Sequence, residues 1–600
     1  MPLFRRSSSV VAAALLSACV SACVSGAIAA PIKVELVQKD GKWQLMREGK
    51  PFFVRGGGGE GSLKVLTAAG GNSKRTWGAD NIGKLLDEAQ ANGVAVAVGI
   101  WLGHERHGFD YNDEKAVQAQ FEMAKAAVMK YKDHPAVLLW GIGNEMEGFG
   151  KGDNPKIWNH INDIAKMIKQ VDPNHPTMTV IAEIGGEKLP SVKKYCPDVD
   201  IMGLNSYGGV LSLPDRYRAA GVNKPFIVTE YGPAGTWETQ KNAYGVTAEK
   251  TSTEKAATYR DAAAKFEKDP MCLGSYAFIW DDKRETTLTW FGLFLPAPGR
   301  ERTAGIDALQ EVWTGKPPAN RVPVVEPIKV AGTDNVNGGD TVKASFKASD
   351  PENDPIKVTW VLKSELDPSE GGDAVAERPS HPEAIVQSSN SDITLKMPKE
   401  GGVYRLYAFV TDDHGGGAVA NVPLHVNGPK SSAAPKAKLP LVLYADGTTG
   451  AYSPSGWMGN AGAIVTDPAC TDNPHSGATC LKIQYNAPDN WGGIAYQSPA
   501  NDWGDQPGGY DLTGAKRLSF WARGENGGEK IEIKVGTIGK DKKYHDTAVV
   551  ARPVTLTKDW KKYEIDLSGK DLSVIKTGLV WSTAGQGKPV VFFLDDVWFE

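Results

Sequence analysis

The sequence predicts a multidomain protein in which a (β/α)8 barrel is followed by two β-rich domains. Six hundred residues exceed what a single hydrophobic core supports. Between Phe52 and about Gly315, short β-type runs alternate with amphipathic helical stretches, and eight such repeats in about 260 residues have the size and rhythm of a TIM barrel. After residue 328, apolar and polar residues alternate with a period of two, which is typical of half-buried strands.

Eight barrel strands are expected from continuously apolar runs, such as 94–100, because strands buried on both faces carry few polar residues. Amphipathic stretches such as 114–131 and 156–171 separate them. An open doubly wound sheet is the alternative arrangement of such repeats. A hairpin over 31–50, turning at Asp40-Gly41, precedes the first strand, and the barrel with this hairpin is assigned to 31–316. The predicted strands are 52–56, 73–77, 94–101, 136–143, 177–183, 200–205, 225–230 and 273–280.

Residues 1–29 have the pattern of an export signal, in which Arg5-Arg6 precedes an apolar run of small residues over 10–24. The run is too short and too rich in Ala and Ser for a transmembrane helix. Two processing routes stay open. The tripeptide Ala-Ile-Ala29 is a small-x-small cleavage site, whereas Leu-Ser-Ala-Cys19 resembles a lipoprotein box whose signal ends before Cys19. We expect an exported protein, either secreted, periplasmic or held at the outer membrane by a lipid, and contact with a membrane only through that anchor.

Two linkers divide the remainder of the chain. Residues 317–327 are rich in Pro and Val, and residues 429–440 are a Pro/Ala/Ser/Lys segment with little to bury. They bound two β-rich domains, 328–428 and 441–600. In the second of these, Lys530–Val535 alternates between apolar and polar residues, and 589–594 is typical of a buried strand.

Both β-rich domains resemble known modules. The segments SDPENDPI (349–356) and VTW (358–360) resemble cadherin-like or polycystic-kidney-disease-type immunoglobulin-like domains, which implies a spacer. Their acidic cluster is either a Ca²⁺ site, since hard carboxylates suit this ion, or a solvated turn. Residues 441–600, with HSGATCLKI (475–483) and LDDVWFE (594–600), resemble galactose-binding-like jelly rolls among carbohydrate-binding modules. This resemblance implies carbohydrate binding and makes Asp446 and Asp595 candidates for a structural Ca²⁺. Trp491 and Trp503 are candidate stacking platforms, whereas Trp521 is expected in the core.

Four cysteines lie beyond the signal segment. In an oxidising compartment, Cys470 and Cys480 are expected to form a disulfide that closes the loop between them, contributing roughly 3 kcal/mol. Cys196 and Cys272 are expected to stay unpaired in the barrel. No CxxC motif or His/Cys cluster predicts a structural metal, and no metal or cofactor is expected in catalysis.

Two apolar strands of the predicted barrel end in glutamate. The run VLLWGIGN leads to Glu145 on strand 4, and PFIVT leads to Glu230 on strand 7. Because the C-terminal strand ends form the active-site face of such a barrel, these carboxylates can bracket one bound group. Cleavage of a glycosidic bond needs this arrangement, in which one carboxylic acid protonates the departing oxygen while a carboxylate meets the anomeric carbon.

The order of GNE on strand 4, TEYG on strand 7 and Trp on strand 8 resembles the retaining glycoside hydrolases of clan A. Within that clan the barrel is most similar to family 2, with further similarity to family 5 and to fungal β-glucanosyltransferases. The resemblance implies that Glu145 is the general acid/base and Glu230 the nucleophile.

The same resemblance implies the roles of four neighbouring residues. Arg75 would hold the nucleophile ionised, and Tyr207 would donate a hydrogen bond to it. Asn144 would bind the sugar 2-hydroxyl, and Trp280 would form the floor under the sugar at the cleavage point. Two residues after strand 3 are also expected to line the cleft: Trp101 and His104.

We therefore expect a retaining hydrolase of β-linked polysaccharides or oligosaccharides, with β-glucan favoured. Whole family 2 enzymes carry two domains ahead of the barrel, whereas only about 25 residues precede it here, which favours an open cleft and a polymer. Transglycosylation from the same intermediate is a close variant, and a non-catalytic glycan-binding envelope protein is the alternative of another class. The net charge of −4 and the lack of a basic stripe argue against nucleic acid as a partner.

Overall fold

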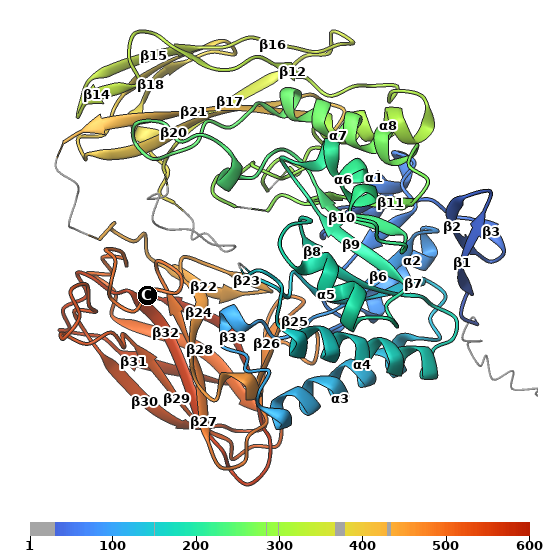
Figure 1. Cartoon of the computed structure of the whole chain (residues 1–600). Helices are drawn as coiled ribbons and strands as arrows, with labels where there is room; N and C mark the ends of the chain where they lie inside the picture. Colours follow the sequence, from blue (N-terminus) through green and yellow to red (C-terminus); the bar gives the residue numbers. More distant parts are fainter. Residues whose placement is uncertain (1–29, 149, 284, 298, 366–377, 429–433) are drawn as a thin grey trace, which may run out of the picture.

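The computed structural model describes residues 30–148, 150–283, 285–297, 299–365, 378–428 and 434–600, which form three domains (Figure 1). The predicted export signal, including Cys19, lies outside these residues. The first domain is a closed barrel, and two β-sandwich domains follow it, so the predicted fold class is confirmed. No helix among the described residues has both the length and the apolar character needed to cross a bilayer.

Eight parallel strands form the barrel and coincide with the eight predicted runs. Their order around the barrel is β10-β11-β4-β5-β6-β7-β8-β9, so each strand pairs with its neighbours in sequence and the last pairs with the first. The strands are β4 (Val54–Gly58), β5 (Ser73–Arg75), β6 (Ala95–Ile100), β7 (Val137–Asn144), β8 (Thr177–Ala182), β9 (Ile201–Asn205), β10 (Phe226–Tyr231) and β11 (Cys272–Phe278).

Eight helices surround these strands, and their ends follow local sequence signals. Asp113 caps α3 by accepting hydrogen bonds from the amides of Lys115 and Ala116, while Asn154 caps α4 directly before Pro155. The helices are α1 (Leu63–Ala68), α2 (Gly83–Ala91), α3 (Glu114–Tyr131), α4 (Pro155–Val171), α5 (Lys188–Tyr195), α6 (Leu213–Ala219), α7 (Ser252–Phe266) and α8 (Ala304–Thr314).

The predicted N-terminal hairpin closes the end of the barrel opposite the candidate site. It consists of β1 (Val34–Lys39), β2 (Lys42–Arg47) and the short β3 (Lys50–Pro51). Val34 and Leu45 are buried against residues from the beginnings of the barrel strands, including Val54 and Leu273. The hairpin therefore continues the apolar interior of the barrel and leaves the other end open.

The second domain packs two four-stranded sheets against each other around Trp360, Leu395 and Leu406. The sheets are β13-β15-β19-β18 and β14-β21-β20-β17, and a short pair, β12-β16, lies beside them. The predicted linker 317–327 contains β12, so part of it belongs to this domain. The strands are β12 (Val324–Val325), β13 (Lys329–Val330), β14 (Asn335–Asn337), β15 (Thr341–Ser345), β16 (Ala348–Ser349), β17 (Lys357–Ser364), β18 (Ile385–Ser388), β19 (Asp392–Lys396), β20 (Gly402–Thr411) and β21 (Gly417–Asn427).

The third domain is also a sandwich of two antiparallel sheets. One contains β23-β22-β33-β26-β25 with β28 and β31, and the other is β24-β27-β32-β29-β30. The strands are β22 (Leu441–Ala445), β23 (Thr448–Thr449), β24 (Ser453–Gly459), β25 (Ile464–Cys470), β26 (Cys480–Tyr485), β27 (Trp491–Gln497), β28 (Arg517–Gly524), β29 (Lys530–Val535), β30 (Val550–Thr555), β31 (Lys561–Asp566), β32 (Thr577–Ala584) and β33 (Val590–Phe599).

The three tryptophans singled out in the third domain differ in their exposure to solvent. Trp491 is 48% exposed and Trp503 is half-buried. Trp521 does not enter the core, because Phe520 and Ala522 beside it on β28 point inward and a strand alternates its faces. Its ring stacks on His475 instead, with ring centroids 3.7 Å apart.

The expected disulfide is not formed in this structure. Cys470 and Cys480 are direct partners in the pairing of β25 with β26, and both are buried, but their thiols are not joined. Cys196 and Cys272 are buried and free, as expected.

The predicted Ca²⁺ positions are bound by backbone amides. Asp446 Oδ1 accepts hydrogen bonds from the amides of Ala478 and Thr479, and Asp595 Oδ2 accepts them from the amides of His475 and Ser476. In the second domain, Asp350 likewise caps a turn over the acidic segment 349–356, which agrees with the turn alternative. No group of three or more His, Cys, Asp or Glu side chains that could hold a metal occurs in the described part of the chain. A structural Ca²⁺ stays a prediction.

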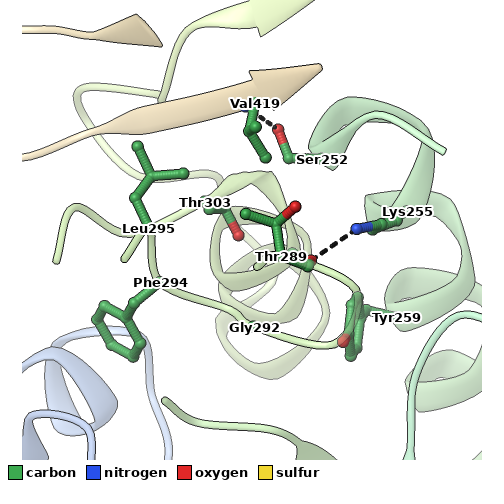
Figure 2. A pocket seen from close by; sticks show the side chains of 10 residues that line it. Ser252, Lys255, Tyr259, Thr289, Gly292, Phe294, Leu295, Thr303 and Val419 are labelled. Carbon is green, nitrogen blue, oxygen red and sulfur yellow. Dashed lines mark hydrogen bonds between the residues drawn. The ribbon is translucent and has the colours of Figure 1, made fainter. Parts of the chain in front are cut away.

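The second domain docks on the barrel beside α7 and α8 (Figure 1). Figure 2 shows the small cavity at this junction, where the hydroxyl of Ser252 at the start of α7 accepts a hydrogen bond of 2.9 Å from the amide of Val419 on β21. On the barrel side of the cavity, Lys255 donates to the Thr289 carbonyl at 2.8 Å. Leu295 from the barrel packs with Tyr407 and Val419 in one apolar cluster.

Charged side chains are buried in the same interface. Arg405 on β20 pairs with Glu365 and donates to the Thr247 carbonyl at 2.9 Å. Glu249 pairs with Lys255 and accepts a hydrogen bond of 2.8 Å from Asn421 on β21. None of these four charged side chains is more than 7% exposed. Burial alone would raise the pKa of Glu249, but Lys255 and Arg405 reverse this and hold the pKa below its usual range.

Candidate active site

Glu145 and Glu230 emerge at the C-terminal end of the barrel, on its open side. Strand β7 is apolar along its length and ends at Asn144, so Glu145 is the first residue beyond it. Glu230 lies near the end of β10, whose residues are all buried. The backbone of Glu145 adopts a φ of 52°, a left-handed conformation that costs free energy for a residue with a side chain and is concentrated at functional sites.

Three hydrogen-bond donors converge on the Glu230 carboxylate. Arg75 at the end of β5 and Trp77 just after it each donate to Oε1 at 2.8 Å, and the Tyr207 hydroxyl donates to Oε2 at 2.8 Å. The Arg75 and Glu230 side chains are 3% and 8% exposed, so water screens their ion pair little. Hydrogen-bond donors therefore hold both oxygens of the Glu230 side chain in place. Burial, followed by the charge of Glu230, raises the pKa of Tyr207 well above its usual range, so this residue remains a donor.

Glu145 has a different environment. Its Oε1 accepts a hydrogen bond of 2.7 Å from the amide of Asn205, which is a neutral donor. Burial and then the nearby charge of Glu230 raise the pKa of Glu145 to about 7. The two carboxyl groups therefore lie in unequal environments. Glu230 accepts hydrogen bonds from Arg75, Trp77 and Tyr207, whereas the pKa of Glu145 is raised to about 7.

Asn144 and Asn205 connect the two carboxyl groups. Asn144 Oδ1 accepts hydrogen bonds from Arg75 at 2.6 Å and from Asn205 at 3.3 Å. Asn205 is oriented in turn by Thr229, whose hydroxyl donates to its side-chain oxygen at 2.7 Å. This chain of contacts crosses the barrel mouth from β5 through β7 to β9 and fixes the relative orientation of Glu145 and Glu230.

Trp280 does not lie in the barrel mouth, so its expected place under the sugar is wrong. It is 1% exposed, its indole donates to the Ser62 carbonyl, and its ring lies 6.5 Å from that of Trp313 on α8. It thus faces outward into the packing between strands and helices. Phe278 takes the position beside the carboxylates instead, with its ring edge-on to those of Trp77 and Tyr207 at 6.0 and 5.8 Å.

The two residues predicted after strand 3 form a stacked pair. Trp101 is 42% exposed, and His104 is buried beneath it with ring centroids 5.1 Å apart. His104 therefore supports the indole of Trp101 rather than presenting its own ring to the solvent.

A second exposed indole, Trp237, lies on the loop after β10. It is 63% exposed, and its ring stands edge-on to that of Tyr207 at 5.6 Å. Exposed aromatic rings that face a polar cleft are suited to binding carbohydrate or other flat ligands.

Sequence reasoning missed four residues of this site: Trp77, Asn205, Trp237 and Phe278. Two of them carried a usable signal, because Trp77 directly follows strand 2 and Asn205 ends strand 6, where side chains point into the barrel mouth. Phe278 and Trp237 carried none, since their places depend on how the end of β11 and the loop after β10 turn.

Comparison with known proteins relates the barrel to glycoside hydrolases. Residues 79–261 match the family model of the TIM barrel domain of glycosyl hydrolases family 2. A β-glucuronidase of Paenibacillus borealis is 27% identical over 199 residues, which cover 28% of this chain and 30% of that protein. Mannan endo-1,4-β-mannosidase F of Aspergillus clavatus is 35% identical over 69 residues, which cover 12% of this chain and 16% of that protein. The chain thus spans less than a third of the length of these relatives.

Solved structures give matches of lower identity. A β-glucuronidase of Faecalibacterium prausnitzii covers 47% of this chain and 52% of its own, with 18% identity and a TM-score of 0.36. A family 2 member from Bacteroides cellulosilyticus covers 94% of this chain and 64% of its own, with 13% identity and a TM-score of 0.35. The segment 79–261 is thus similar to the TIM barrel domain of the family 2 glycosyl hydrolases.

Proposed function

We propose that this protein is a retaining glycoside hydrolase that cleaves a β-linked glycan, with Glu230 as nucleophile and Glu145 as general acid/base. The observation that carries the proposal is the unequal environment of the two carboxyl groups. Arg75, Trp77 and Tyr207 direct three hydrogen-bond donors at Glu230, while burial and the charge of Glu230 raise the pKa of Glu145 to about 7. A pair of carboxyl groups that act as nucleophile and acid needs such unequal environments.

The reaction would proceed in two displacements. Glu230 attacks the anomeric carbon and forms an ester bond to the sugar, while Glu145 gives its proton to the glycosidic oxygen, which leaves as an alcohol. Water then attacks the same carbon, Glu145 accepts the proton of that water, and the bond to Glu230 breaks. Two inversions restore the original configuration. Arg75 orients Glu230 for the attack, and Asn205 orients Glu145 in both steps.

The proposed substrate is a β-linked polysaccharide or oligosaccharide, with β-glucan favoured. Two exposed indoles, Trp101 after β6 and Trp237 after β10, stand on different sides of the carboxylates and suit several sugar units in a row. The names of two curated relatives, a β-glucuronidase and an endo-1,4-β-mannosidase, both refer to β-linked sugars. The amino-terminal signal and the carbohydrate-binding resemblance support an exported protein that acts on a glycan outside the cytoplasm.

Substitution of each carboxyl group tests the assignment. Glu230→Gln should lower kcat by at least about 10³-fold on every substrate, because no nucleophile remains. Glu145→Gln should be comparably inactive on a natural glycoside but should retain much more activity on a 2,4-dinitrophenyl glycoside, whose leaving group needs no proton. The matched control is Glu187→Gln at an exposed position before α5, which should behave as the wild type.

The stereochemistry and the pH profile provide independent tests. NMR should show that the first product keeps the β configuration, and an inverted product would contradict the double displacement. The form of Glu145 that donates a proton is present below its pKa and is lost as the pH rises through about 7, so kcat/KM should fall on the alkaline side of that value. A profile that stays flat from pH 6 to pH 9 on a natural glycoside would exclude Glu145 as the acid.

A further inference from the structure

A cavity of about 380 Å³ lies beside the candidate site, between the end of β4 and the loop that leads into α2. Its walls include Glu60, Trp77, Asp80, Asn81 and Ile82. The volume falls in the range of small-molecule sites, about 300–1,000 Å³. Neither the sequence patterns nor the reaction steps above use this cavity.

Trp77 joins the cavity to the catalytic carboxylates. Its indole forms part of the cavity wall, and its Nε1 donates to Glu230 at 2.8 Å, so a ligand in the cavity lies one side chain away from the nucleophile. Gly58 at the end of β4 makes this placement possible, because a Cβ atom there would lie 3.1 Å from the indole and press against it. An indole beside a polar hollow is suited to contact with the apolar face of a sugar ring.

Two carboxylates, Glu60 and Asp80, stand among the polar groups of the cavity wall, beside the neutral Thr76 and Asn81. Glu60 is 74% exposed and has Lys74 at 3.4 Å, while Asp80, also exposed, has no ion-pair partner among the described residues. Carboxylates of this kind bind sugar hydroxyls as acceptors. They repel a second carboxylate, since like charges at close range are unfavourable.

The third domain borders the far end of the cavity. Asn81 in the cavity wall donates through Nδ2 to Asp467 on β25 at 2.9 Å. The loop before α2 is therefore held between the barrel and this domain, and a further acidic side chain lies at the boundary.

We infer that this cavity is a subsite for an uncharged sugar unit of the substrate chain, and that it makes the enzyme prefer neutral glycans over those that carry uronic acids. The inference rests on the proposed function for the identity of the ligand, and it narrows the substrate class. If the inference holds, a glucuronic acid unit is disfavoured at this position of the bound chain.

The test measures binding to the full-length protein carrying Glu230→Gln, so that no turnover occurs. Isothermal titration calorimetry would compare β-linked gluco-oligosaccharides of two and four units with a tetrasaccharide of matched linkage that contains glucuronic acid. Lengthening the neutral chain from two to four units should tighten Kd by about 10-fold, because only the longer chain reaches the cavity. The uronic acid tetrasaccharide should bind about 10-fold more weakly than the neutral one.

Charge reversal at the cavity provides the decisive variant. Asp80→Lys should strengthen binding of the uronic acid tetrasaccharide by about 10-fold and change binding of the neutral disaccharide little. Asp87→Lys on the exposed face of α2 is the matched control and should leave all three affinities unchanged. Both variants should fold normally because both positions are exposed, and melting temperatures would check this.

The outcomes are distinguishable from those of the catalytic proposal. The subsite would be overturned if the protein with an unchanged cavity bound both tetrasaccharides equally, or if Asp80→Lys left the affinity for the uronic acid tetrasaccharide unchanged. This holds even if Glu230→Gln abolishes hydrolysis. Conversely, the predicted binding preference without any loss of activity in Glu230→Gln would keep the subsite and overturn the catalytic assignment.

Discussion

The two β domains are attached to the barrel in different ways. The second domain contacts α7 and the loops around it through charged side chains, Arg405, Glu249 and their partners, that are no more than 7% exposed. The third domain contacts the barrel through a solvent-exposed hydrogen bond between Asn81 and Asp467. A buried charge network is unfavourable when one partner is missing, whereas an exposed contact contributes little. We infer that the second domain behaves as part of the barrel and the third as an attached module.

This difference affects the candidate site. The loop between β10 and α7 begins two residues after Glu230 and carries the exposed Trp237. It ends in the segment that Arg405 and Asn421 hold through Thr247 and Glu249. The second domain therefore holds the α7 end of a loop that borders the barrel mouth, a contact that the spacer role implied by its sequence resemblance did not predict.

The largest expected effect is that of Arg405→Met, which breaks the buried network. It leaves Glu365, which is 5% exposed, without its cationic partner, and we expect a loss of about 3–5 kcal/mol in the free energy of unfolding. Calorimetry should show the barrel and the second domain unfolding together at a lower temperature. The control is Arg517→Met, which removes exposed ion pairs in the third domain and should cost at most about 1 kcal/mol. Equal shifts in both variants would contradict the comparison.

Removal of the exposed indole of Trp237, on the loop between β10 and α7, should have an intermediate effect. Trp237→Ala should raise KM for β-linked oligosaccharides by about 5–10-fold, which corresponds to about 1 kcal/mol, while kcat and the melting temperature change little. The matched variant is Trp457→Ala, which removes an indole of similar exposure from the third domain. It should leave hydrolysis of short soluble oligosaccharides unchanged. A larger effect of Trp457→Ala than of Trp237→Ala would place the chain-binding surface in the third domain.

The smallest effect is expected at the contact between the barrel and the third domain. Asp467→Ala should change the free energy of unfolding by no more than about 1 kcal/mol, since the hydrogen bonds that its carboxylate accepts from Asn81 and from the amide of Ala469 are solvent-exposed. Differential scanning calorimetry should keep every transition within a degree or two of the wild type. A loss comparable to that of Arg405→Met would mean that the third domain is coupled to the barrel as firmly as the second.

The fold was largely predictable because its signals are local. Apolar runs of strand length mark all eight barrel strands, and Asp113 and Asn154 mark the beginnings of their helices. The places of Glu145 and Glu230 at strand ends follow from the same patterns. Trp280 was misplaced because it lies two residues beyond the end of β11, where the chain has left the regular alternation of a strand and the side chain turns outward.

The sequence by itself determined the barrel, the order of the domains and the two glutamates at the strand ends, because periodicity and chain order are properties of neighbouring residues. Only the tertiary structure decided that Trp77 and Asn205 complete the site, that Phe278 replaces Trp280 beside it, and that Arg405 supports a barrel loop from another domain. These contacts join residues far apart in the chain. The burial that raises the pKa of Glu145 exists only once the barrel has folded, and the charge of Arg405, which helps to lower the pKa of Glu249, reaches it only when the second domain packs against the barrel.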